Sequence, residues 1–194
     1  MSSSRSLARL RNGLIVAATG LGGIWLLIYA GAYDVGADAP HSGPVFRLLD
    51  IIRQRSIAVR SADVVPPSDL DDPKRLARGA ALYGEMCSGC HLAPGMEASE
   101  ISQGLYPRAP DFRKGTSLSP QQAFWVIKHG IKMTGMAAWG VTHGDELIWD
   151  MVAFVGKLPS LSSADYRAAI SNAPQEHEHA MHATGQGEPG GGRQ

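Results

Sequence analysis

Cysteine is almost absent from this sequence, since its 194 residues contain only Cys87 and Cys90. A disulfide framework across the fold is therefore excluded, and local chemistry must explain a pair spaced three positions apart. An excess of charge is absent too, because 18 lysines and arginines balance 18 aspartates and glutamates. This balance gives no reason to expect a nucleic-acid partner.

Strand-like patterning is also missing. No segment alternates convincingly between apolar and polar residues with period two, so we expect an all-α fold without a sheet. A length of 194 residues suits one ordinary domain with extensions. We divide the chain into an N-terminal membrane anchor (1–33), a linker with an amphipathic helix (34–70), a globular domain (71–161) and a disordered tail rich in His and Gly (162–194).

The N-terminal region lacks charge from residue 12 to residue 33. Its apolar run, residues 14–30, approaches the roughly 30 Å hydrocarbon thickness of a bilayer when helical. Cleavage of a signal peptide after Ala32 is the alternative, but this run is longer than the typical apolar core of about 7 to 15 residues. We therefore favour an anchor in the inner membrane. The preceding arginines, Arg5, Arg9 and Arg11, predict a cytoplasmic N-terminus and a periplasmic globular domain.

The segment from Val45 to Arg60 carries apolar residues at roughly helical spacing, with four arginines elsewhere on it. One interpretation is a basic amphipathic helix that lies on the membrane or docks on a partner. The other is a short helix that packs on the globular domain or bridges to it. The sequence favours neither.

The globular domain is expected to contain three main helices. Their N-terminal signals are an aspartate followed by proline, a serine followed by proline, and a threonine with an aspartate three residues later. We expect the first after an N-cap at Asp71 or Asp72, the second from Ser119 to Gly130, and the third from Thr142, capped with Asp145, to Lys157.

The remaining histidines are scattered or lie in the tail. We interpret His41, His129 and His143 as surface or capping residues because they show no common spacing. His and Met together suit copper, but we favour a solvated tail of low complexity for the segment that contains them. The tail residues concerned are His177, His179, Met181 and His182.

Cys87-Ser88-Gly89-Cys90-His91 fits the C-x-x-C-H pattern of covalent haem attachment. Each thiol adds to one haem vinyl group, and two intervening residues let both reach adjacent edges of the macrocycle. The next residue then offers its imidazole to the iron. A thioredoxin-like pair would accompany a βαβ pattern, which is absent. A structural zinc site would need four ligands, and there is no second cysteine pair.

A second axial ligand is expected well downstream of this motif. A methionine in that position raises the reduction potential relative to a second nitrogen ligand. The candidate segment is residues 130–139, which contains Met133, Met136 and glycines that let the backbone approach the ring.

The chain resembles a class I cytochrome c of the bacterial, membrane-anchored, mono-haem group over about residues 72–160. Gly79 and Tyr83, eight and four residues before Cys87, match family positions that pack the first helix on the last. The resemblance implies an opposing aromatic in the last helix, for which Trp149 is the candidate. It also implies that a proline carbonyl, best matched by Pro94, accepts the other ring proton of His91.

The distal side of the haem follows from the same resemblance. Residues 104–107 and 109–111 resemble the family loop beside the haem, and Gly135-Met136 matches the distal methionine segment. Met136 is thereby the expected iron ligand. Ala137 stands where a proline commonly follows, which leaves Met133 as the alternative. Tyr106 and Trp139 either line the haem crevice or bond a propionate, or they are plain core.

The resemblance implies one covalent haem c and one-electron transfer between respiratory redox partners, with no substrate chemistry at the protein itself. Two axial ligands leave no open position on the iron. The alternative is a permanent electron-input subunit of a larger membrane oxidase or reductase complex. A haem sensor or enzyme, in which the distal ligand dissociates, is a further alternative.

Overall fold

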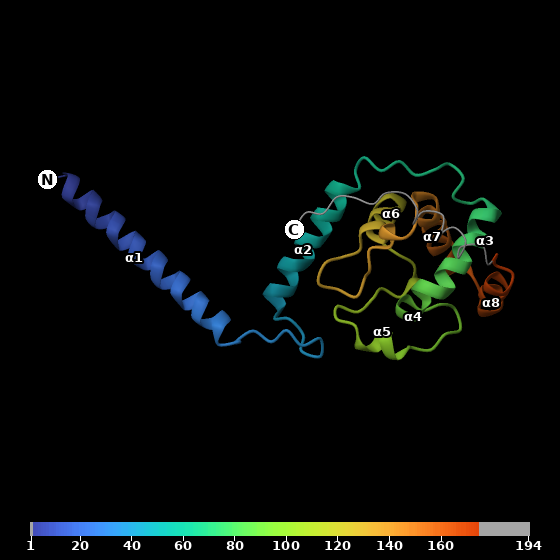
Figure 1. The fold of residues 1–194 in the computed structure, drawn as a ribbon, viewed down its shortest axis with the longest axis horizontal. Helices are drawn as coiled ribbons and strands as arrows, with labels where there is room; N and C mark the ends of the chain where they lie inside the picture. Colours follow the sequence, from blue (N-terminus) through green and yellow to red (C-terminus); the bar gives the residue numbers. More distant parts are fainter. Residues whose placement is uncertain (1, 175–194) are drawn as a thin grey trace, which may run out of the picture. The chain divides into compact units, whose positions relative to one another are not determined.

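The computed structural model describes residues 2–174 and contains only helices and connecting loops within them, so the all-α prediction is confirmed there. Two compact units are present, residues 1–39 and a unit that begins at Pro40. Figure 1 shows the helices of the second unit gathered around a common interior. The elements are α1 (Ser2–Tyr29), α2 (Gly43–Arg60), α3 (Pro73–Leu82), η1 (Tyr83–Cys87), α4 (Ser88–His91), α5 (Glu100–Gly104), η2 (Phe112–Lys114), α6 (Pro120–His129), η3 (Trp139–Val141), α7 (Asp145–Lys157), η4 (Leu158–Ser160) and α8 (Ser163–Ser171).

Helix α1 is apolar and has no buried residue in its hydrophobic stretch. Ser6–Tyr29 has a mean hydropathy of 1.6 and is long and apolar enough to cross a membrane. A signal sequence meets the same criterion of length and composition, so this criterion does not distinguish an anchor from a signal peptide.

Helix α2 confirms the predicted helix over Val45–Arg60, and it packs on the globular domain, which is one of the interpretations that the sequence left open. It belongs to the second compact unit and contacts α6. Ile57 and Ser61 at its C-terminal end are buried, with 6% and 3% of their surfaces exposed. The apolar spacing predicted the helix, whereas its contact with residues more than sixty positions away could not be read from the segment itself.

The core forms where α3 crosses α7. Asp72 caps α3 by accepting from the Lys74 and Arg75 amides, and Pro73 stands in the first turn, as predicted. Gly79 permits the close crossing, because a Cβ there would lie 2.1 Å from the Asp150 carbonyl oxygen. Figure 1 shows the two helices side by side.

The aromatic partner of this crossing differs from the expectation. Tyr83 is fully buried and its ring centroid lies 5.6 Å from that of Phe154. Trp149 instead stacks on Phe124 of α6, at 4.2 Å. The assignment of Trp149 as the partner of Tyr83 was therefore wrong. Phe154 lies near Gly79, where a Cβ would meet its Cβ at 2.9 Å.

Helix α6 begins after a capping box of Ser119 and Gln122 and ends before Gly130, as predicted. Helix α7 begins three residues later than expected, after Gly144. Thr142 does not cap it, because its hydroxyl pairs with His143 Nδ1 at 2.8 Å. His143 was predicted to be a surface or capping residue, and at 4% exposure the surface alternative is wrong.

Helix α8 corrects the predicted disorder from residue 162 onward. Ser162 and Asp165 form a capping box, and Tyr166 is buried against Tyr83 and Phe154. A serine with an aspartate three residues later was the signal that could have revealed this helix. The His-rich tail segment with His177, His179, Met181 and His182 lies outside the described residues.

Asp150 is the centre of a buried ion-pair cluster between α3 and α7. It is fully buried and contacts Arg75 at 2.8 Å and Arg78 at 2.6 Å. Arg75 also reaches Asp69 and Glu146, at 3.1 and 3.0 Å. A carboxylate at zero exposure needs such partners, because the desolvation of an unpaired charge is very costly.

Candidate haem site

The C-x-x-C-H segment occupies two consecutive helical turns. The π-helical turn η1 ends at Cys87, and α4 then places Cys90 and His91 on the next turn. Tyr83 holds the chain directly after His91 in place, because its hydroxyl donates to the Leu92 carbonyl. Leu92 itself has a φ of +60°, which ends α4 and turns the chain. The short helix thus presents both thiols and the imidazole from one compact stretch.

The two cysteines have different surroundings. Cys87 is 9% exposed and belongs to the core, whereas Cys90 is half-buried, and both are free thiols. Burial raises the pKa of the Cys87 thiol to about 12, with a smaller contribution from Cys90. Thiol–disulfide exchange requires a thiolate and is favoured by a lowered pKa. The environment of Cys87 therefore argues against a thioredoxin-like role.

A structural zinc site is also disfavoured. No group of three or more His, Cys, Asp or Glu side chains within the described part of the chain is placed to hold a metal ion. A closed zinc site takes four such ligands.

His91 is held in one orientation by two contacts. Its Nδ1 lies 2.9 Å from the Pro110 carbonyl oxygen, and its ring stacks on Phe112 at 4.2 Å with an interplanar angle of 2°. Because a carbonyl only accepts, Nδ1 carries the proton and Nε2 keeps its lone pair. Burial lowers the pKa of His91, although the Pro110 hydrogen bond opposes this. A neutral imidazole with a free Nε2 lone pair is the form that ligates a metal.

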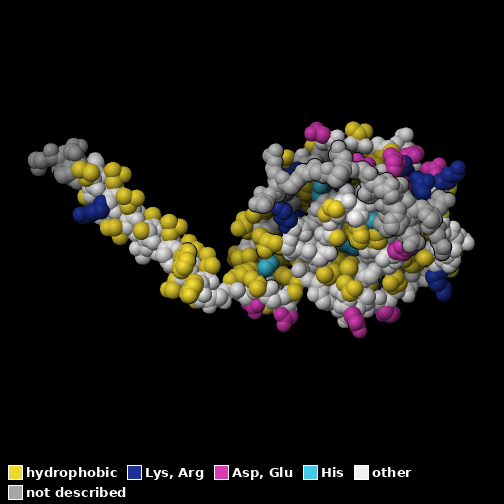
Figure 2. All heavy atoms as spheres, viewed as in Figure 1, with side chains coloured by type: hydrophobic (Ala, Val, Ile, Leu, Met, Phe, Trp, Pro, Cys, Tyr) yellow, Lys and Arg dark blue, Asp and Glu magenta, His cyan; other side chains and the backbone are white. Residues whose placement is uncertain are grey.

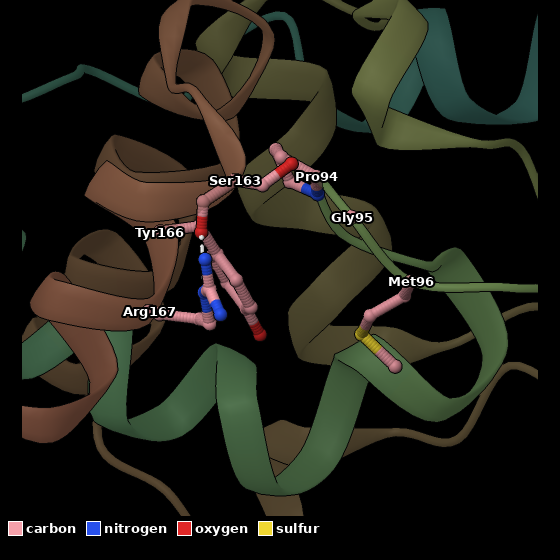
Figure 3. Close-up of a pocket in the computed structure, with 6 residues that line it drawn as sticks. All are labelled: Pro94, Gly95, Met96, Ser163, Tyr166 and Arg167. Carbon is pink, nitrogen blue, oxygen red and sulfur yellow. Dashed lines mark hydrogen bonds between the residues drawn. The ribbon is translucent and has the colours of Figure 1, made fainter.

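Pro94 was the expected acceptor of this proton, and that assignment was wrong. Figure 3 shows Pro94, Gly95 and Met96 along a shallow pocket whose other side is formed by α8. Gly95 has a φ of +83° and lies directly against Ser163. The turn after Leu92 thus takes Pro94 towards α8, and a proline from the loop 109–111 approaches His91 instead. That loop had been matched to the family loop beside the haem, but without a role for Pro110.

The two candidate methionines differ sharply in exposure. Met133 is 92% exposed with a φ of +60°, at the tip of a tight loop. Met136 is partly buried and packs against the hydrophobic core. Its amide donates to Thr134 Oγ1 at 3.1 Å, and its carbonyl accepts from the Ile131 amide at 3.2 Å. Of the two thioethers, only that of Met136 lies against the core, which favours it as the distal ligand.

Gly130 makes this loop possible. It has a φ of +63°, and a Cβ there would lie 2.6 Å from the Met136 carbonyl oxygen. The loop therefore closes on the end of α6 and brings Met136 back to the core, as the glycines of this segment had suggested.

Tyr106 and Trp139 have identifiable partners. The Tyr106 hydroxyl accepts from the His41 amide at 2.9 Å, and the two rings meet edge to face at 5.1 Å. Trp139 begins η3, packs against the core and lies 5.8 Å from the His143 ring. Propionate binding by either side chain stays a prediction.

Sequence reasoning missed Phe112 altogether. It follows Asp111, which caps η2 by accepting from the Arg113 amide and pairs with the Arg113 guanidinium at 2.7 Å. Arg113 also donates to the Met96 carbonyl at 2.8 Å. These contacts hold Phe112 against His91. The aspartate N-cap signal was visible in the sequence, but the stacking partner was not.

The family model described as cytochrome c oxidase, cbb3-type, subunit III, matches residues 74–155. This range contains the C-x-x-C-H motif, the Pro110 loop and the Met136 loop. Residues 74–155 form a c-type cytochrome domain. The match covers less than half of the chain and does not include α1 or α2. No curated protein and no solved structure matches the chain significantly.

A c-type cytochrome domain implies haem c, and the residues present fit that group. The Cys87 and Cys90 thiols stand three positions apart, and the His91 imidazole keeps its Nε2 lone pair. The Met136 thioether, in the loop after α6, is partly buried against the core. Cys87 and Cys90 would hold haem c through thioether bonds, and His91 and Met136 would supply the nitrogen and sulfur donors to its iron. The cytochrome domain contains one such set, in agreement with its two cysteines.

Proposed function

We propose that this chain is a membrane-anchored, mono-haem cytochrome c that carries single electrons between respiratory redox partners in the periplasm. The observation that carries the proposal is the hydrogen bond from His91 Nδ1 to the Pro110 carbonyl, within a C-x-x-C-H motif. It leaves the Nε2 lone pair available in a buried, correctly protonated imidazole. The apolar helix α1 supports the anchor, and its flanking arginines support the periplasmic side.

The roles of the residues follow from their surroundings. Cys87 and Cys90 would hold the haem covalently, which would make its retention independent of noncovalent affinity. His91 and Met136 would supply the two iron ligands, and the Phe112 stack restricts rotation of the His91 imidazole. When bound, haem c supplies a one-electron couple between ferric and ferrous iron. With His91 and Met136 both bound to the iron, the chain would transfer electrons without binding a substrate at the metal.

The distal ligand is tested by comparing Met136→Ala with Met133→Ala in the full chain. The oxidised protein should show the weak charge-transfer band of a methionine bound to ferric haem. Met136→Ala should abolish this band and allow the ferrous form to bind carbon monoxide. Met133→Ala should leave both properties unchanged, because its side chain is 92% exposed.

The matched pair also tests the alternative of a haem sensor or enzyme with a dissociating distal ligand. Carbon monoxide binding by the unaltered ferrous protein would favour that alternative. Loss of the band in Met133→Ala alone would overturn the assignment of Met136.

A second candidate function is that of a permanent electron-input subunit of a membrane oxidase or reductase. The observation in its favour is the match of residues 74–155 to a family described as an oxidase subunit. The two candidates share the same haem site and differ only in whether the chain stays bound to one complex. Copurification distinguishes them.

A further inference from the structure

Helix α2 is fixed to the cytochrome domain near both of its ends. Just before its N-terminal end, the His41 amide donates to the Tyr106 hydroxyl at 2.9 Å. At its C-terminal end, Ile57 and Ser61 are buried, and the helix contacts α6. Anything that binds the outer side of α2 would therefore orient the whole domain.

The outer side of α2 is apolar. Leu48, Ile51, Ile52 and Val59 recur at helical spacing, and each is between 56% and 65% exposed. Figure 2 shows hydrophobic side chains gathered on the side of the domain where Figure 1 places α2. Four large aliphatic side chains on one exposed stripe form an apolar patch of the kind that marks an interaction site.

The charges on α2 are almost all positive. The helix has one acidic residue, Asp50, which pairs with Arg53 one turn later. The other three arginines, Arg47, Arg55 and Arg60, have no acid on the helix to offset them. Arg47 lies at one edge of the apolar stripe, Arg55 lies within it one turn before Val59, and both are exposed. An apolar stripe that carries exposed arginines at its edge and within it is complementary to a bilayer surface that contains anionic lipid.

The connection to α1 keeps α2 close to such a surface. Residues 30–42 join the two helices and reach at most about 45 Å when fully extended. If α1 spans the membrane, α2 starts within that distance of the lipid headgroups whatever path the connection takes. The local concentration of lipid surface around α2 is then high, so weak interfacial binding is sufficient.

We propose that α2 lies on the surface of an anionic bilayer, with Leu48, Ile51, Ile52 and Val59 in the headgroup region and Arg47 and Arg55 on lipid phosphates. This inference rests on the proposed membrane location of the chain but not on its haem ligation. Because α2 is fixed to the domain near both ends, the contact sets which face of the cytochrome domain points away from the membrane. Electron partners would then meet an oriented domain.

The test uses the full, haem-loaded chain in nanodiscs, with a nitroxide label at position 52 or, as control, at position 141. Val141 is 83% exposed and lies outside α2. In discs of phosphatidylcholine with phosphatidylglycerol, the label at position 52 should collide several-fold more with oxygen than with a water-soluble nickel chelate, relative to position 141. Arg47→Gln with Arg55→Gln should reduce this difference.

Three results would overturn the proposal. The first is equal nickel accessibility at positions 52 and 141 in anionic discs. The second is shielding of position 52 that is unchanged in discs of phosphatidylcholine alone, which would remove the role of charge. The third is shielding that depends on more than one chain per disc, which would indicate a second copy as the partner. Co-elution with neutral discs tests the anchor separately, and the visible spectrum tests haem ligation.

Discussion

His91 is a residue whose chemistry is set by its neighbours. The Pro110 carbonyl fixes the tautomer, and the parallel ring of Phe112 fixes the plane of the imidazole. Phe112 is in turn held by the cap of η2 and by the Asp111–Arg113 pair. Positioning contacts of this kind reduce the motion that an iron ligand must lose when it binds.

Asp150 gives a prediction at the same scale. Asp150→Asn should lower the free energy of unfolding by about 3 kcal/mol, because Arg78 loses its carboxylate partner and Arg75 keeps only its exposed partners Asp69 and Glu146. Denaturant unfolding of the full chain, followed by circular dichroism, measures this. The control is Asp145→Asn, which removes a surface pair with Lys128 and should cost less than about 1 kcal/mol. Similar losses for both variants would show that the buried cluster contributes little.

Helices α3 and α7 depend on each other through a backbone contact. Gly79 has no side chain, and the Asp150 carbonyl occupies the space that a Cβ would take. Around this contact Tyr83, Phe154 and Tyr166 fill the core, with contributions from η1, α7 and α8. The crossing therefore places the C-x-x-C-H segment, which continues directly from α3.

A methyl group at the crossing tests this dependence. Gly79→Ala should destabilise the domain by about 3 kcal/mol, because backbone atoms at 2.1 and 2.8 Å cannot rotate away. Gly156→Ala is the matched control, since a Cβ there meets nothing within 4 Å in an exposed turn of α7. That variant should gain about 0.5 to 1 kcal/mol from helix propensity. Thermal unfolding of both variants measures these changes in stability. A Gly79→Ala variant as stable as the unaltered protein would contradict the close crossing of α3 and α7.

The described residues comprise a long apolar helix and a compact unit that includes α2 and the cytochrome domain. The proposed membrane anchor would confine the search for partners to the membrane surface and raise their effective concentration. It serves a mobile carrier and a permanent subunit equally well. A carrier and a permanent subunit differ in how long the chain stays bound to its partner complex.

Extraction in mild detergent tests that lifetime. A carrier should elute as a single haem protein and exchange electrons rapidly with separated membrane complexes, because transient redox contacts are small. A permanent subunit should elute with a larger complex and stay with it through a second column. Size-exclusion chromatography with haem absorbance provides the measurement. Coelution that persists at high salt would replace the carrier proposal with the subunit proposal.

Local patterns in the sequence predicted a large part of this protein. Helical periodicity and capping residues placed α2, α3 and α6, and the C-x-x-C-H spacing predicted the candidate haem attachment site, because each of these signals lies within a few neighbouring residues. Length and composition alone identified the apolar N-terminal helix. These features do not depend on how distant segments meet.

Contacts between distant segments were decided only by the tertiary structure. Pro110 rather than Pro94 meets His91, Phe154 rather than Trp149 meets Tyr83, and α8 packs where a disordered tail was expected. The choice of Met136 over Met133 likewise rests on which side of one loop faces the core. Each outcome depends on the turns after Leu92 and Gly130 and on the α3–α7 crossing. A local pattern can indicate that a turn or helix exists, but the direction it takes is set by the packing of the whole domain.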